Sequence, residues 1–291
     1  MKILGVLLMG LLLVFSTAGS QDVRADEADE AYKTGLKYYN GEGVTQNRGE
    51  ALRWFRKAAD QGHANAQYNI GVMYNEKGRG VAQDYTVALQ WFQKAAEQGN
   101  ASAQNNVGWM YFMGEGVPQD YAEAMKWYRL AADHGKASAQ FNIGWMYENG
   151  KGVTQDYAEA VKWYRKAADQ GYASAQFNIG VMYDNGKGVT QDFTEAMRWY
   201  RKAADQGVAE AQYNIGLMYD KGEGVPQDYA EAMKWYRLAA DHGKASAQFN
   251  IGRMYEKGDG VSQDFTEAKK WFQKAADRGH QGAKDVLEKL K

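Results

Sequence analysis

Residues 173–207 read ASAQFNIGVMYDNGKGVTQDFTEAMRWYRKAADQG, and this stretch decides the fold because it returns along nearly the whole chain. One glycine marks each copy, and these glycines are Gly35, Gly71, Gly108, Gly144, Gly180, Gly216 and Gly252. Their spacings are 36, 37, 36, 36, 36 and 36 residues, with one extra residue in the loop at 75–78. A fixed period of this length is typical of a solenoid, in which each repeat buries its apolar face against the next.

Each repeat is predicted to form two helices joined by a glycine-rich loop. In the first helix, Ala175, Ile179 and Met182 are spaced four and three residues apart, so they share one face. The helix is expected to end at Asn185–Gly188, where glycines permit positive backbone φ angles. Gly180 costs about 1 kcal/mol relative to alanine inside a helix, so its return in every repeat predicts close helix packing there.

The second helix has a clear start. Asp192 and Glu195 stand three residues apart, the spacing of a capping box in which each side chain satisfies a backbone N–H group at the helix N-terminus. Paired carboxylates also serve acid–base catalysis, but capping accounts for both residues at this spacing. The helix continues with Trp199 and Tyr200 among alanines, an arrangement that favours a packed core over a stacking platform for bases or sugars.

Composition narrows the classes of function. The chain has 291 residues, a formal net charge of -1 and no cysteine, so neither nucleic acid nor an anionic membrane is an expected partner, and disulfides and thiolate sites are excluded. Its four histidines lie in different repeats, and no phosphate loop or catalytic triad spacing is present. We therefore expect no metal, no cofactor and no catalytic residue.

The first residues differ from the rest of the chain. Lys2 precedes an unbroken run of apolar residues and glycines from Ile3 to Phe15, followed by small residues. Thirteen residues are too few to cross about 30 Å of hydrocarbon as a helix. A signal peptide over residues 1–25 is expected, cut between about 18 and 25, although an uncut membrane anchor is the alternative. The mature chain is then periplasmic or secreted, without a membrane span.

The motifs A-x-A-Q-x-N-I-G-x-M-Y, G-x-G-V-x-Q-D-Y-x-E-A and W-Y-x-K-A-A-x-x-G resemble the Sel1-like repeats, relatives of the tetratricopeptide repeats, over residues 28–280. The resemblance implies an all-α, right-handed α/α superhelical solenoid with a concave groove. Seven repeats are expected over residues 26–280, followed by a capping helix over 281–291. The resemblance also implies an adaptor for protein complexes, in regulation or host contact. One cysteine-rich branch is β-lactamase-like, but its cysteines are absent here.

The resemblance also indicates which residues face a partner. The positions two before and one after the first-helix glycine line the groove in tetratricopeptide repeats. The first position holds an asparagine in six repeats, namely Asn69, Asn106, Asn142, Asn178, Asn214 and Asn250. An asparagine ladder can donate to and accept from a peptide backbone, or it can bond the neighbouring repeat and hold the stack together.

The second position varies, as expected where recognition differs between repeats. It holds Leu36, Val72, Trp109, Trp145, Val181, Leu217 and Arg253. Trp109 and Trp145 are candidates for an apolar hot spot, unless they are buried. The sequence thus predicts a monomeric, non-catalytic scaffold that binds a protein or peptide. The alternative is an enzyme or enzyme accessory acting on cell-wall material.

Overall fold

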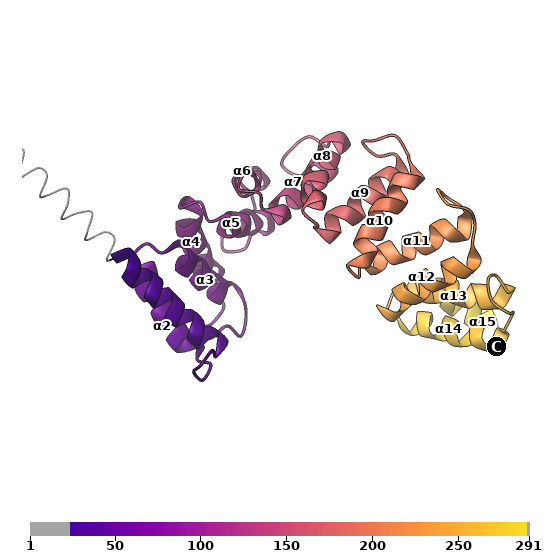
Figure 1. The fold of residues 1–291 in the computed structure, drawn as a ribbon, viewed down its shortest axis with the longest axis horizontal. Coiled ribbons are helices and arrows are strands. Elements are labelled where there is room, and N and C mark those ends of the chain that lie inside the picture. The colour runs from indigo at the N-terminus through magenta and orange to yellow at the C-terminus, as the bar shows by residue number, and fades with distance from the viewer. Residues whose placement is uncertain (1–23, 290–291) are drawn as a thin grey trace, which may run out of the picture. The chain divides into compact units, whose positions relative to one another are not determined.

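The computed structural model describes residues 24–289, and every regular element in that range is a helix (Figure 1). Residues 24–40 belong to a first helix. It is followed by α2 (Arg48–Ala59), α3 (Ala64–Asn75), α4 (Tyr85–Glu97), α5 (Ala101–Met113), α6 (Tyr121–Asp133), α7 (Ala137–Asn149), α8 (Tyr157–Asp169), α9 (Ala173–Asn185), α10 (Phe193–Asp205), α11 (Ala209–Lys221), α12 (Tyr229–Asp241), α13 (Ala245–Lys257), α14 (Phe265–Asp277) and α15 (Gln281–Lys289). The predicted all-helical solenoid of two-helix repeats is confirmed.

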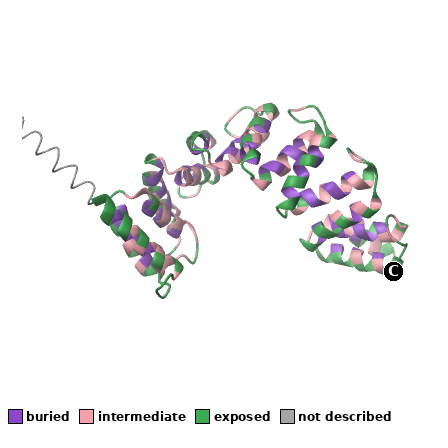
Figure 2. Cartoon of the chain, in the orientation of Figure 1, coloured by how far each residue is buried: buried purple, intermediate pink, exposed green. Residues whose placement is uncertain are grey.

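The core lies between successive helices, as Figure 2 shows along the described chain. One cluster of buried residues, for example, lies between α10, the second helix of its repeat, and α11, the first helix of the next repeat. The first-helix face predicted from the spacing of Ala175, Ile179 and Met182 is indeed buried, with at most 1% of each residue exposed. The chain divides into two compact units at residues 139 and 140.

The recurring first-helix glycine seats an aromatic ring. A Cβ atom added to Gly180 would lie 2.5 Å from Cδ1 of Tyr200, much closer than side chains pack. The same clash would arise at the other first-helix glycines, each against the ring of its own second helix. The close packing predicted from Gly180 is therefore confirmed.

The two adjacent aromatic residues of the second helix differ in burial, although both were predicted to lie in the core. Tyr200 is fully buried, but only Trp199 among the seven repeat tryptophans is buried, and the other six are half-buried. Trp235, for example, packs at the edge of the α10–α11 core. Where a lysine follows three residues later, it covers the ring; the Lys166 ammonium lies 3.9 Å from the Trp163 centroid.

The predicted capping box is only half formed. The Asp192 carboxylate accepts from the backbone N–H of Glu195 at 3.0 Å, as expected. The reciprocal bond is missing because the Asp192 N–H donates to the Tyr183 carbonyl at 3.0 Å. Glu195 instead pairs with Arg198 at 3.0 Å. The acidic side chain still favours the helix N-terminus through its charge.

The loops end the first helices as predicted, with one exception. Gly186 and Gly188 have φ angles of 65° and 71°, in the left-handed region that favours glycine. In the repeat with the extra residue, α3 is followed by Glu76 in an extended conformation. There Arg79 pairs with Glu76 and donates to the Tyr39 hydroxyl at 2.9 Å, so the longer loop is tied to the preceding repeat.

At the end of the described chain, α15 packs against α14 through buried Ala283 and partly buried Val286 and Leu287. The predicted signal peptide lies almost wholly outside the described residues, which begin at Arg24. Within residues 24–289, no helix has the length and apolar character needed to cross a membrane.

Replacing Gly180 with alanine should lower the free energy of unfolding by about 1–2 kcal/mol, because the cost of overpacking against Tyr200 exceeds the gain in helix propensity. Thermal unfolding, with amide exchange of α9 and α10, measures this. Gly49→Ala is the matched control, since a Cβ there would approach nothing closer than 3.4 Å. Equal stability of the two variants would contradict the role given to the glycine.

Candidate partner-binding site

The asparagines of the ladder all lie on first helices and are half-buried. In the C-terminal unit, three of them meet a tyrosine of the preceding repeat. The Asn178, Asn214 and Asn250 side chains hydrogen-bond to the hydroxyls of Tyr164, Tyr200 and Tyr236, respectively. These contacts join one repeat to the next, as the stacking alternative for the ladder requires.

An acid at the end of the preceding first helix completes each of these contacts. The Tyr164 hydroxyl donates to Glu148 at 2.6 Å, and the Tyr200 hydroxyl donates to Asp184 at 3.1 Å. Burial is the main cause that raises the pKa of both tyrosines above their ordinary value, so the hydroxyls remain protonated donors. A buried hydroxyl that is hydrogen-bonded on both sides fixes the neighbouring repeats in register.

The asparagines that follow the first two repeats, Asn69 and Asn106, meet different groups. Phe55 and Phe92 replace the tyrosine there, and neither ring offers a hydroxyl. Asn106 bonds to the Tyr68 hydroxyl, an equivalent of the contact that Asn250 also makes with Tyr213. No hydrogen bond of the Asn69 side chain is found within residues 24–289. Asn142 also has an interaction partner. The contacts thus favour stacking over peptide binding for Asn106, Asn178, Asn214 and Asn250.

Trp109 is the more exposed of the two tryptophans predicted to bind a partner. It is 43% exposed, and its ring stacks on Phe112 with centroids 5.8 Å apart. Phe112 in turn contacts Tyr121 at 5.2 Å, and neighbouring Met113 is 47% exposed. We name Trp109, Phe112, Met113 and Tyr121 the Trp109 patch. Trp145 is half-buried and has interaction partners of its own.

Phe112 and Met113 were not among the site residues predicted from the sequence. They stand four and five residues after the first-helix glycine, where the later repeats carry acids, asparagines or lysines. Their departure from the repeat was the available signal. The apolar surface at this point is therefore wider than Trp109 alone would offer.

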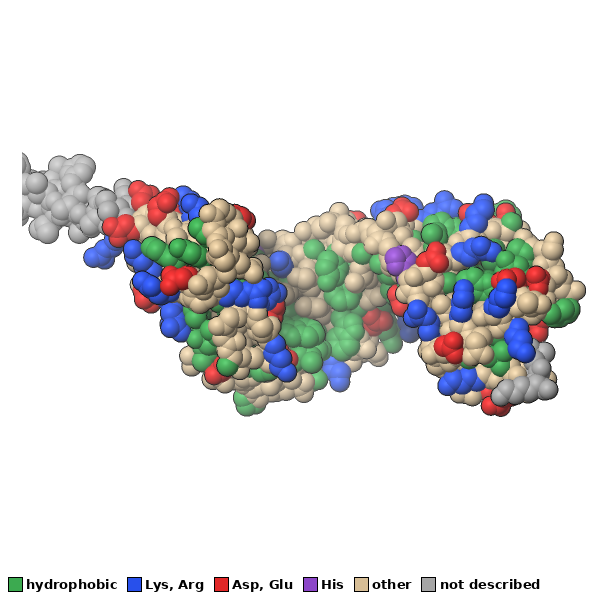
Figure 3. Space-filling model, turned by 90° about the horizontal axis from the view of Figure 1, so that it is seen from below, with side chains coloured by type: hydrophobic (Ala, Val, Ile, Leu, Met, Phe, Trp, Pro, Cys, Tyr) green, Lys and Arg blue, Asp and Glu red, His purple; other side chains and the backbone are tan. Residues whose placement is uncertain are grey.

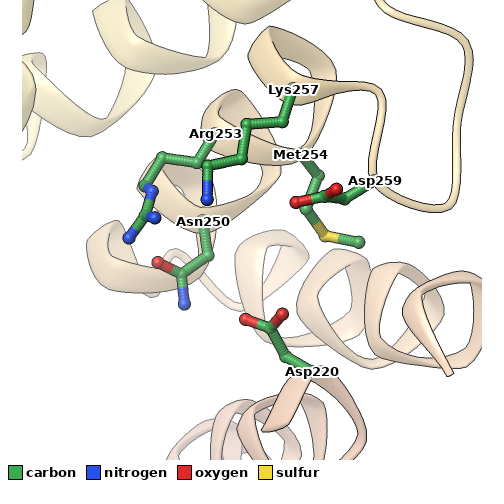
Figure 4. A pocket seen from close by; sticks show the side chains of 6 residues that line it. All are labelled: Asp220, Asn250, Arg253, Met254, Lys257 and Asp259. Carbon is green, nitrogen blue, oxygen red and sulfur yellow. The ribbon is translucent and has the colours of Figure 1, made fainter. Parts of the chain in front are cut away.

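Two depressions in the C-terminal unit are lined by equivalent residues of successive repeats. The first has a volume of about 250 Å³, and its lining includes Asp184, Asn214, Leu217, Lys221 and Glu223. The second, of about 30 Å³, lies one repeat further on. Figure 4 shows its lining, which consists of Asp220, Asn250, Arg253, Met254, Lys257 and Asp259. Leu217 and Arg253 are equivalent residues, so the chemistry of the depression changes between repeats.

Charges of both signs are interspersed on the face seen in Figure 3, a distribution that suits a protein partner better than nucleic acid. Within residues 24–289, no cluster of three or more histidine, cysteine, aspartate or glutamate side chains is arranged to hold a metal ion.

The fold and this first-helix face define a helical repeat protein of the solenoid class. The Sel1 repeat profile matches residues 31–63, 64–100, 101–136, 137–172, 173–208, 209–244 and 245–280. The chain therefore belongs to the Sel1 repeat family, and it carries seven such repeats.

Two solved structures are similar over most of the chain. One is a protective antigen of uropathogenic Escherichia coli, 38% identical with a TM-score of 0.87, covering 93% of this chain and 58% of the antigen. This chain thus spans little more than half of that protein. The other is a Sel1 repeat protein from Oxalobacter formigenes, 37% identical with a TM-score of 0.76, covering 91% of this chain and 77% of the relative. No curated protein matches.

Replacing Asn178 and Asn214 with alanine should lower the free energy of unfolding by about 1 kcal/mol per site, because each change removes a hydrogen bond from a buried tyrosine hydroxyl. Urea unfolding measures the loss. Asn69→Ala is the matched control. It changes the same repeat position, but the ring of the preceding repeat is Phe55, which has no hydroxyl to lose a hydrogen bond. A loss as large for Asn69 would show that the tyrosine contact is not the cause.

Burial raises the pKa of Asp184, although the Tyr200 hydrogen bond opposes the shift. The folded state therefore binds the proton more tightly than the unfolded state, and stability falls as pH rises from the ordinary pKa through the raised one. Asp184→Asn should remove this fall and gain stability relative to the native chain across that window. Unfolding at a series of acidic pH values tests it, with exposed Asp205→Asn as the control. If the free energies of unfolding of Asp184→Asn and the native chain differed by the same amount at every pH in the window, Asp184 would not be the group that titrates.

Proposed function

We propose that this chain is a non-catalytic, exported scaffold that binds an extended segment of a protein partner along its first helices. The observation that carries the proposal is the accessible Trp109 patch, which lies on the helix face where repeats differ in sequence. Tryptophan anchors are common in binding hot spots because they bury a large area on contact.

The division between recurrent and variable residues supports this function. The recurrent glycines, alanines and second-helix aromatics pack the core, and the recurrent aspartates cap helices. The residue directly after the first-helix glycine varies between repeats. In all seven repeats, from Leu36 in the first to Arg253 in the last, this residue is at least partly exposed. A surface that is accessible and differs between repeats suits specific recognition of a partner.

Export rests on the signal-like residues 1–25, and the periplasm or the cell exterior are the two destinations that they favour. The relative that is a protective antigen supports a location accessible to a host. Because this chain spans 58% of that antigen, the antigen supports the proposed location and not a shared role.

Trp109→Ala should reduce partner capture about thirtyfold, the effect of losing a hot-spot side chain worth about 2 kcal/mol. Cross-linking in the exporting cell, followed by purification and quantitative mass spectrometry, measures the captured partner. Trp145→Ala tests the second tryptophan in the same way.

Leu130→Ala is the control for lost apolar surface, because Leu130 is 46% exposed on the second helix α6 and lies outside the Trp109 patch. Each variant is first checked for native helicity and melting temperature. Capture by a folded Trp109→Ala protein at the level of Leu130→Ala would refute binding at the patch.

A further inference from the structure

Within residues 24–289, one methionine is accessible and the others are buried. Met113, the last residue of α5, is 47% exposed. The other nine methionines in this range are at most 5% exposed, and Met110 on the same helix is only 1% exposed. An oxidant that reaches the folded protein from solvent therefore meets a single accessible thioether in the described part of the chain.

The end of a first helix does not require a methionine. The equivalent residues of the other repeats are all polar, namely Asn40, Glu76, Asn149, Asn185, Lys221 and Lys257. The two asparagines of the middle repeats hydrogen-bond back to their own helices, as Asn185 does to the Val181 carbonyl at 2.8 Å. Met113 offers no such bond, and α5 is ended instead by Gly114, whose φ angle is 76°. The thioether is therefore a feature of this surface and not of the repeat.

Met113 extends an apolar surface that is sensitive to a polar atom. It follows Trp109 by four residues, so both side chains project from the same side of α5. The neighbouring Phe112 ring stacks on Trp109. Oxidation to the sulfoxide would place a strong hydrogen-bond acceptor at the edge of this surface. A partner that covers the surface with apolar groups would then bury that oxygen without a donor, which is unfavourable.

We propose that Met113 is a selective oxidation site, whose conversion to the sulfoxide weakens partner binding at the Trp109 patch. Hydrogen peroxide is the oxidant: its O–O bond breaks, one oxygen forms a bond to the sulfur, and the peroxide is reduced to water while the sulfur loses two electrons. The chain has no cysteine, so no thiol of its own competes for the peroxide. The proposed export also brings the chain into an oxidising environment. The inference rests on the proposed function, because it acts through the same patch.

Treatment with hydrogen peroxide at neutral pH, followed by digestion and mass spectrometry of the peptides, tests the selectivity of the site. In the folded native chain, Met113 should gain one oxygen atom at least about tenfold faster than any of the nine buried methionines, because only its side chain is accessible. In urea the rates should become similar. Similar rates in the folded protein would overturn Met113 as the selective site.

Partner capture tests the consequence of oxidation. Exporting cells receive a pulse of hydrogen peroxide before cross-linking, and the protein that the native chain captures in untreated cells is quantified. Once the peptides show that Met113 is oxidised, capture by the native chain should fall about tenfold. Met113→Leu keeps an apolar side chain of similar size without the sulfur, so it should keep its capture after peroxide. Met113→Gln should lose capture without peroxide. Each variant is first checked for native melting temperature.

Unchanged capture by the native chain after oxidation of Met113 would overturn the proposal. An equal loss in Met113→Leu would also overturn it, since oxidation would then act at another site. The outcome for Trp109→Ala separates this proposal from the proposed function. Capture that is lost in Trp109→Ala but unaffected by peroxide refutes the effect of oxidation alone. Capture that survives in Trp109→Ala but is lost on oxidation of Met113 refutes only the tryptophan anchor.

Discussion

The contact between a second-helix aromatic ring and a first-helix glycine is the constraint on which the rest of this structure depends. The ring of Tyr200 lies where the Cβ of any other residue at position 180 would be, so the two helices of the repeat approach more closely than ordinary side chains allow. Once that distance is fixed, the small alanines at 196, 203 and 204 can be fully or almost fully buried. Each repeat thus gains a core despite having only two short helices.

The same ring also connects the core to the surface. Where the buried aromatic is tyrosine, its hydroxyl extends past the glycine and reaches an acid of its own repeat and an asparagine of the next. Because this polar contact is partly buried, each group needs the other two, and a shift of one repeat against the next would leave a hydroxyl unpaired. Phe55 and Phe92 pack the same site without that requirement, so the register of the first two repeats depends more on apolar fit.

Much of this fold follows from the sequence because the period places each residue type at a fixed helical position. The glycine spacing predicted the repeat length, and the spacing of Ala175, Ile179 and Met182 predicted the buried face. The capping box was predicted from the same kind of local spacing, but only half of it forms. The Asp192 N–H has a second acceptor in Tyr183, nine residues earlier, and a spacing of three residues does not reveal that competitor.

The candidate site was harder to predict for a related physical reason. Sequence position indicated that the asparagines lie on the first helix, but their partners come from another repeat and become evident only when the helices are packed. Trp109 was identified because it stands at a position that varies between repeats, whereas Phe112 and Met113, one turn later, depart from the residues of the later repeats and were missed. In a repeat protein the core imposes the same residues again and again, so a departure at an exposed position is not required by packing. Departures that are exposed, adjacent in space and chemically alike, such as the Trp109 patch, are therefore better evidence of recognition than any recurrent residue.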